Sequence, residues 1–477
     1  MRILSQLHTR WTQPNGYRHV FAVSLPLVAS MGTITLMQFT DRVFLANYSV
    51  DAITAALPAG IVSFTLISFF MGVAGYTNSF VAQYAGAEAL DRVGAALWQG
   101  IYFSIFAACF LALFYFLSNP LFNLIGHSAN VRSLEIVYFD ILTLGAGLVV
   151  LSSALSCFYT GRGKTWTVMW VHLVGAALNI PLDYCLINGV GPFPELGIVG
   201  AGIATVSASI IINLLFILLI FSRNNRKTFG TWKNRRFDRG LFGRLMLYGL
   251  PSGGQFFVEI FGFAVFVQML GRVGNLELAA SNIVLSIESI AFLPVFGFHI
   301  GTSTLVGQAI GHNRPEDAVC ATTSSLHIAV AYMSLMMVIF VFLPEPLLEF
   351  FRNNQADPVI SGQIMDLGIV LLRFVAIFVF FDAMNLTFSG ALKGAGDTQF
   401  IFWATAALSC VIMIIPVYLA VEIFNSGIYI AWAIATVYIA ALGLTLYLRY
   451  RSGKWKTMRV IETELVIREP LKRGTPR

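Results

Sequence analysis

Three acidic residues lie deep inside long apolar stretches of this 477-residue chain. They are Asp41 in MQFTDRVFLAN, Glu259 in GGQFFVEIFGFAV and Asp382 in VFFDAMNLTFSG. An ionised side chain in the middle of a bilayer costs ~2.5–3.5 kcal/mol, so acids at such positions are expected to face a cavity or a partner. We interpret them as groups that bind and release a positive charge. For Asp41, a salt bridge or helix cap near a helix end is the competing interpretation.

A fourth acid forms a pair with an amide. Asn179 and Asp183 in GAALNIPLDYCLI are four residues apart, which places both on one face of a helix. Together with Asp41 they predict a polar pocket in the first half of the chain, although they could also simply bond neighbouring helices. Oxygen-only ligands suit a hard cation or a proton, whereas a transition metal would favour histidine or cysteine.

The elements that carry these residues are membrane spans. The chain is 57% hydrophobic and 11% charged, with a mean hydropathy of +0.76, which is too apolar for a water-soluble fold. About 20 apolar residues cross a bilayer, and twelve such stretches predict an all-α polytopic membrane protein. They are roughly 19–47, 54–81, 94–118, 135–157, 166–188, 197–221, 243–270, 278–309, 321–344, 362–391, 400–423 and 427–449. The N-terminus does not have the pattern of a removable signal peptide.

The chain also repeats itself. Seven positions recur at a constant offset of 225: Leu25, Pro26, Gly72, Thr77, Gln83, Gly86 and Asp91 match Leu250, Pro251, Gly297, Thr302, Gln308, Gly311 and Glu316. Later in each half, Gly161 matches Gly394 at an offset of 233. We therefore predict two homologous six-helix bundles, 1–221 and 245–450, with a basic linker at 222–244 and a tail at 451–477. Two six-span units related by an axis along the membrane normal are a transporter architecture.

The acids do not follow the repeat. The residues at the equivalent positions of the other repeat are Phe266 for Asp41, Ile34 for Glu259 and Val149 for Asp382, and none of them is acidic. Each acid was therefore placed individually on a duplicated scaffold, which favours a function over a packing role. Pro26 and Pro251 do match, within the first span of each half. Each removes a helical hydrogen bond, so the pair marks either two hinges or, more simply, two fixed bends.

Lys and Arg gather in the linker, in the two termini and near Arg162, and are sparse in the alternate loops. The positive-inside rule then places both termini and the linker in the cytoplasm. The clusters are separated by membrane spans, which argues against nucleic-acid binding. No phosphate-binding loop of the GxxxxGK[ST] type occurs, and the loops offer no catalytic cluster, so we expect neither ATP hydrolysis nor another enzyme activity. Nothing resembles the repeated filter of a channel.

Taken together, the span-1 pattern LP…FTDRVFLAN, LNIPLDY, the span-6 stretch GIVGAGIAT, Glu259 and FFDAMNLTFSGALKGAGDT resemble the multidrug and toxic compound extrusion (MATE) transporters, closest to the bacterial NorM-like branch. The resemblance covers about residues 15–450. It implies a MATE-type fold in the bacterial inner membrane that exports small organic cations by antiport against protons or sodium, with no bound cofactor, and we expect a monomer. It also implies an N-terminal cation site of Asp41, Asn179, Asp183 and Thr205, with sodium a candidate at Asp41 and Asp183, and a C-terminal site of Glu259 and Asp382.

One departure concerns the ion. Many NorM-like members have a tyrosine one turn before the span-10 aspartate, and this chain has Phe378, which cannot supply a hydroxyl ligand. That favours protons at the C-terminal site. A lipid-linked precursor flippase of the wider superfamily is the alternative function, although its cavity is expected to be cationic. The sequence assigns no role to Glu288, His299, Asp140 or Arg373, for which structural roles are the simpler interpretation.

Overall fold

The computed structural model describes residues 9–125, 127–351 and 358–466. Within these ranges the protein is helical without strands, and twelve helices are long and apolar enough to cross a membrane. The predicted all-α, twelve-span fold is confirmed. Residues 1–8 of the predicted N-terminal bundle and residues 467–477 of the predicted tail lie outside the described residues.

The twelve spans fall into two sets of six. The first set is α2 (Tyr17–Tyr48), α3 (Val50–Gly75) continued by α4 (Thr77–Gly86), α5 (Leu90–Ala112) continued by η1 (Leu113–Leu117) and α6 (Ser118–Ile125), α7 (Ala129–Thr160), α8 (Thr165–Asn188) and α9 (Ile198–Ile220). The second is α11 (Arg239–Val273), α12 (Asn275–Gly311), α13 (Pro315–Phe342) followed by α14 (Pro344–Glu349), α15 (Pro358–Ala395), α16 (Thr398–Leu408) continued by η2 (Ser409–Ile414), α17 (Ile415–Tyr418) and η3 (Leu419–Ile423), and α18 (Ile428–Arg451).

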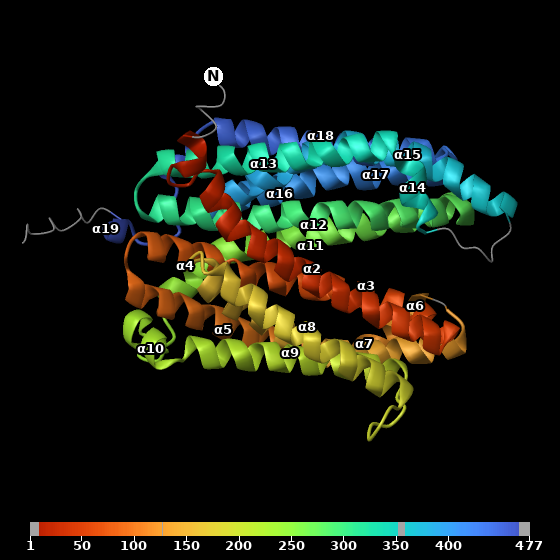
Figure 1. Ribbon diagram of the computed structural model, residues 1–477, viewed down its shortest axis with the longest axis horizontal. Coiled ribbons are helices and arrows are strands. Elements are labelled where there is room, and N and C mark those ends of the chain that lie inside the picture. Colours follow the sequence, from red (N-terminus) through yellow and green to blue (C-terminus); the bar gives the residue numbers. More distant parts are fainter. Residues whose placement is uncertain (1–8, 126, 352–357, 467–477) are drawn as a thin grey trace, which may run out of the picture.

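The same helix pairs recur in both sets. In the first half, α7 packs on α3, α5 and α9, and α2 packs on α8; in the second, α15 packs on α12, α13 and α18, and α11 packs on α16. Figure 1 shows the two sets as two layers, red to yellow-green and green to blue. The layers meet because the first helix of each half leans on the other half: α2 packs on α12, and α11 on α3.

The linker between the two sets is partly helical and is bonded to α5. Its middle forms α10 (Arg223–Phe229), and α11 already begins at Arg239, so residues 239–244 belong to the seventh span and not to a loop. The rest is tied to α5: the Trp98 indole donates to the Thr231 carbonyl at 2.6 Å, and the Asn234 amide to the Asp91 carbonyl at 2.8 Å. Asp238 accepts from the Leu241 amide and thereby caps α11. The predicted linker is thus held against the first half by hydrogen bonds up to the start of α11.

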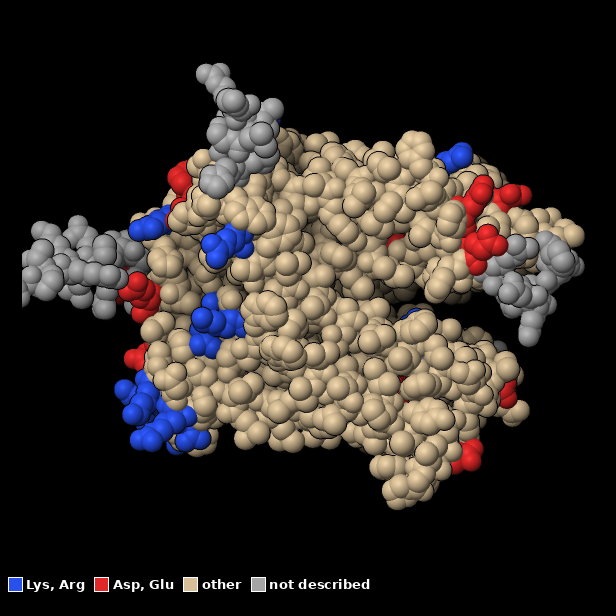
Figure 2. All heavy atoms as spheres, viewed as in Figure 1, with Lys and Arg blue, Asp and Glu red and all other residues tan. Residues whose placement is uncertain are grey.

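One end of the molecule carries α10, the tail segment (residues 452–466) and most of the visible Lys and Arg side chains, and we call it the basic end (Figure 2). At this end the two layers converge. At the opposite end Figure 2 shows the surface hollowed between the layers, so the molecule is closed at the basic end and open at the other.

Repeated residues build this closure. The Gln83 amide donates to the Gly394 carbonyl at 2.9 Å, and the Gln308 amide to the Gly161 carbonyl at 2.8 Å. Gln83 matches Gln308 and Gly161 matches Gly394, so these are two copies of one bond across the boundary between the halves. We call this boundary at the basic end the seam.

Glycines allow the seam to close. A Cβ atom at Gly86 would overlap the backbone of Gln308, and one at Gly311 the backbone of Gln83. Further along, a Cβ at Gly72 would lie 2.7 Å from the Cα atom of Gly253. Backbones this close leave no room for a side chain, which explains why glycines recur in these apolar stretches.

Candidate functional site

The N-terminal polar pocket joins three helices. Asp41 on α2 lies close enough to Asp183 on α8 and to Tyr138 on α7 for the three polar groups to interact electrostatically. Asp183 is completely buried and Tyr138 nearly so. The sequence predicted the two acids but missed the tyrosine, because a single Tyr in an apolar helix carries no signal of its own.

These acids are short of partners. Among the residues that the structure describes, neither carboxylate oxygen of Asp183, nor Oδ1 of Asp41, nor the amide nitrogen of Asn179 has a hydrogen-bond partner, and all four atoms are buried. Buried carboxylates are normally paired or coordinated. Two adjacent carboxyl groups can hydrogen-bond each other only if one holds a proton, and a bound cation would satisfy the same oxygens.

The other two predicted members of this site, Asn179 and Thr205, differ in how they are placed. Asn179 is buried one helical turn before Asp183 on α8. Thr205 on α9 is half-buried, and no hydrogen bond joins its side chain to the other three within the described ranges. The electrostatic interactions therefore join Asp41, Asp183 and Tyr138, with Asn179 one turn away on α8, and the roles of Asn179 and Thr205 in cation binding stay predictions.

A third acidic residue lies near the two predicted acids of the C-terminal half. Asp382 on α15 interacts electrostatically with both Glu259 on α11 and Glu288 on α12. The Gln255 amide donates to Glu259 at 2.6 Å, and the Asn385 amide to Asp382 at 3.2 Å. Glu288 thus lies beside the predicted pair, which the sequence alone did not indicate because Glu288 is distant from both in the chain.

Two further residues complete this C-terminal cluster. Lys393 on α15 lies close enough to Glu259 for the two charges to interact, and the Tyr438 hydroxyl on α18 lies near both Glu259 and Asp382. Lys393 is partly buried and lies at the seam, where its backbone carbonyl accepts from Tyr76 and Ser79.

The span that faces Glu259 is irregular. Between α16 and α18 the chain forms two π-helical segments, η2 and η3, and a Cβ atom at Gly262 would lie 2.8 Å from Ser409 Oγ and from Met413 Cε of η2. π-Helical turns are rare and are common at functional sites. Here they bring span 11 close to α11 one turn after Glu259.

The remaining residues that the sequence singled out have ordinary surroundings. His299 bonds the Leu386 carbonyl at 2.8 Å and His172 bonds Ser30 at 2.5 Å. Asp140 lies near Ser118, and Arg373 is exposed. α2 and α11 continue through Pro26 and Pro251. Whether these prolines act as hinges stays a prediction.

The donor atoms fit an alkali cation better than a transition metal. No group of three or more His, Cys, Asp and Glu side chains that could hold a metal ion occurs in the described part of the chain. The N-terminal pocket supplies carboxylate, amide and phenol oxygens, which are hard ligands.

Twelve spans in two similarly packed sets, with isolated acids buried in each, define a membrane transporter of the two-repeat type. Comparison with known proteins identifies the family of transporters. The MatE family model matches the chain twice, over residues 26–185 and 251–419, and the two matches begin 225 residues apart at Pro26 and Pro251. The chain belongs to this family, the MATE multidrug transporters, and is not an enzyme.

Individual relatives agree. The chain is 26% identical over 470 residues to the probable multidrug resistance protein NorM of Thermotoga maritima, covering 95% of this chain and 96% of that one. It is 25% identical to the multidrug resistance protein PmpM of Pseudomonas aeruginosa, covering 80% and 79%. Among solved structures, an outward-facing multidrug resistance MATE transporter of the MOP superfamily shares the fold, with a TM-score of 0.84 at 19% identity over 95% of this chain and 99% of that one.

Proposed function

We propose that this protein is a secondary exporter that exchanges small organic cations for protons or sodium ions. The observation that carries the proposal is the set of buried, unpartnered carboxylate oxygens of Asp41 and Asp183. A site of this kind is stable only when a positive charge occupies it, so release of one cation favours binding of another. Exchange of charges on shared acids is the chemistry of an antiporter.

The two ends of the molecule support alternating access. The halves are held together at the basic end by the Gln83 and Gln308 bonds, and the surface is hollowed at the other end. With the basic end in the cytoplasm, as the positive-inside rule indicates, this arrangement corresponds to a site that is open to the outside. Transport then requires the seam to open. We place the protein in the bacterial inner membrane as a monomer with both termini in the cytoplasm.

The polarity of the interior argues against the flippase alternative. One solved neighbour with the same fold, from Pyrococcus furiosus, is described as having a binding pocket of reversed polarity that suggests a different function. In this chain the acids Asp41, Asp183, Glu259, Glu288 and Asp382 outnumber the bases that interact with them, Arg42 and Lys393. A net negative interior favours cations over lipid pyrophosphate.

The test is efflux of a cationic dye from proteoliposomes with a proton gradient and a sodium gradient imposed separately. We expect efflux to depend on at least one gradient, and Asp41→Asn and Glu259→Gln to abolish it, since each change removes charge and keeps shape. Dependence on neither gradient would refute the antiport proposal. Native rates in both variants would refute the two acid sites.

The same preparation distinguishes the ions. Dye affinity measured between pH 5.5 and 8.5, with and without sodium, on the native protein and on Asp382→Asn, assigns the competitor at the C-terminal cluster. The sequence favours protons there. Affinity that is flat with pH but falls as sodium rises would assign sodium, and Tyr438 would then be the hydroxyl to replace with phenylalanine.

A further inference from the structure

The tail segment crosses from one half of the protein to the other. It begins on the C-terminal half, where the Trp455 ring is 1% exposed and stacks on Tyr450 with ring centroids 5.0 Å apart. Lys456 pairs with Glu316 at 3.3 Å, and the Arg459 guanidinium donates to Asn313 at 3.1 Å. All three contacts are to helices of the second set or their connections.

Its other end is buried against the N-terminal half. Val460 and Ile461 are 1% and 4% exposed and belong to an apolar cluster formed mainly by α4, α5, α7 and α9. The Val460 amide donates to Gln83 Oε1 at 3.0 Å. Gln83 therefore uses its nitrogen to close the seam and its oxygen to hold the tail segment.

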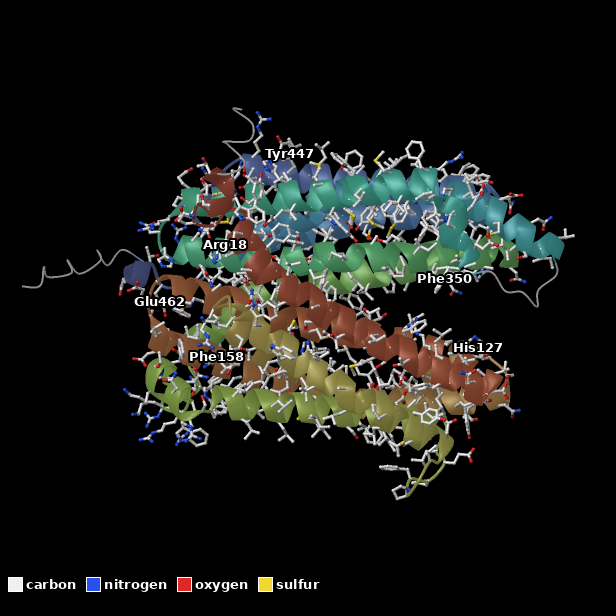
Figure 3. The ribbon with its side chains drawn as sticks, viewed as in Figure 1. Arg18, His127, Phe158, Phe350, Tyr447 and Glu462 are labelled. Atoms are coloured by element: carbon white, nitrogen blue, oxygen red, sulfur yellow. The ribbon has the colours of Figure 1, made fainter. Side chains whose placement is uncertain are left out.

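Glu462 fixes this end with charge. Its carboxylate accepts from the Tyr84 hydroxyl at 2.8 Å, from Arg244 at 2.5 Å and from Arg92. Tyr84 and Arg92 belong to α4 and α5 of the first half, and Arg244 to α11 of the second. Figure 3 labels Glu462 at the end where the two layers converge. One carboxylate thus bonds both halves at the edge of the seam.

We propose that residues 455–462 form a latch that holds the basic end closed, and that Glu462 must leave Arg92 and Tyr84 each time the seam opens. The inference rests on the proposed alternating access. It follows from connectivity: the tail segment is anchored on one half by Trp455 and on the other by Val460, Ile461 and Glu462, so the halves cannot separate while both anchors hold. Glu462 is a positioning residue in this account, since it contacts no transported ion.

Burial disfavours the charged form of Glu462, but the hydrogen bonds from Arg244, Tyr84 and Arg92 outweigh it and lower the pKa of this carboxyl to about 2. The latch is therefore fully charged at physiological pH. Because Glu462 stays charged, the latch is released by separation of the halves and not by the proton gradient.

Seam opening is measured by cysteine labelling. Ser79 on α4 is 2% exposed, and its hydroxyl donates across the seam to the Lys393 carbonyl at 3.2 Å. Ser79→Cys is introduced into full-length protein in which Cys109, Cys185, Cys320 and Cys410 are replaced by serine, which leaves only the buried Cys157. An impermeant maleimide is then added to inside-out membrane vesicles, and the labelling rate is followed with and without imposed gradients and a cationic dye.

We expect Glu462→Gln to raise the labelling rate about fivefold, as suits loss of a partly exposed ion-pair network. Glu464→Gln is the matched control, because Glu464 is exposed two residues further along the same segment, and it should leave the rate unchanged. Arg92→Gln removes the charged partner on the first half without altering the tail segment, so it serves if Glu462→Gln assembles poorly. The double variant should label no faster than the faster single variant, since both changes break the same bond.

The outcomes separate the latch from the transport cycle. If gradients or dye change the labelling of the parent protein but Glu462→Gln and Arg92→Gln label at the parent rate, the latch is refuted and alternating access stands. If Ser79→Cys remains unlabelled in every variant and condition, both proposals fall.

Discussion

Replacement of Asp183 by asparagine is expected to stabilise the protein and to stop transport. Asp183 is completely buried, and neither of its oxygens has a partner. A buried polar atom without a hydrogen bond costs ~1–3 kcal/mol, and more if it is charged. The amide of asparagine has the same shape, carries no charge and can donate to the Asp41 carboxylate.

The magnitude follows from these contacts. Relief of one unpartnered, charge-bearing oxygen and gain of one donor to Asp41 predict a gain of about 1–3 kcal/mol in the free energy of unfolding. For a chain of this size, we expect that gain to raise the melting temperature by roughly 2–5 °C. Stability at the expense of activity is typical of functional sites that hold buried charge.

The assay compares thermal unfolding in detergent and dye efflux from proteoliposomes for the native protein, Asp183→Asn and a control, Asp366→Asn. Asp366 is exposed on α15, so the same chemical change there should alter neither quantity. A variant at Asp183 that melts lower and still exports dye at the native rate would show that the carboxylate is a structural hydrogen-bond acceptor. The reasoning from unpartnered oxygens would then be wrong.

Three further predictions concern the basic end. Lys233 is exposed in the linker, and Lys233→Cys should react with an impermeant maleimide in inside-out vesicles and not in intact cells; labelling of intact cells would reverse the proposed topology. Gly86→Ala should speed labelling of Ser79→Cys by several-fold, because the added Cβ meets the Gln308 backbone, whereas Gly60→Ala, with open space around the position, should not; equal rates would remove the close-packed seam. The pKa of Glu462 is lowered to about 2 by hydrogen bonds from Arg244, Tyr84 and Arg92 that outweigh burial, so its contribution is present above the ordinary carboxyl range near 4.5 and is lost as pH falls through 2. Hydrogen exchange at the Val460 amide, corrected for intrinsic rates, should therefore be constant from pH 5.5 to 8.5, and a change across that range would contradict the assignment.

The sequence by itself determined the span count, the repeat and the buried acids. Each depends on local information: a stretch of about 20 apolar residues must span the bilayer, and an acid within it must have a reason to be there. The offset of 225 also marked Gln83, Gly86, Gln308 and Gly311 as repeated, and the structure shows that they recur for one physical reason. Two backbones come into contact there, and a pair of glutamine side chains satisfies carbonyl groups on the opposite half.

The tertiary structure decided which residues meet. Tyr138, Glu288, Lys393 and Tyr438 lie near the acids in the folded protein, and no spacing rule connects residues on different helices that are dozens of positions apart. The same holds for the tail segment. In the sequence, Glu462 is one charged residue in a polar C-terminal segment. Only the convergence of α4, α5 and α11 at the basic end places two arginines and a tyrosine around it. Sequence periodicity reports which face of a helix is apolar, whereas long-range packing chooses the partners of each polar group on that face.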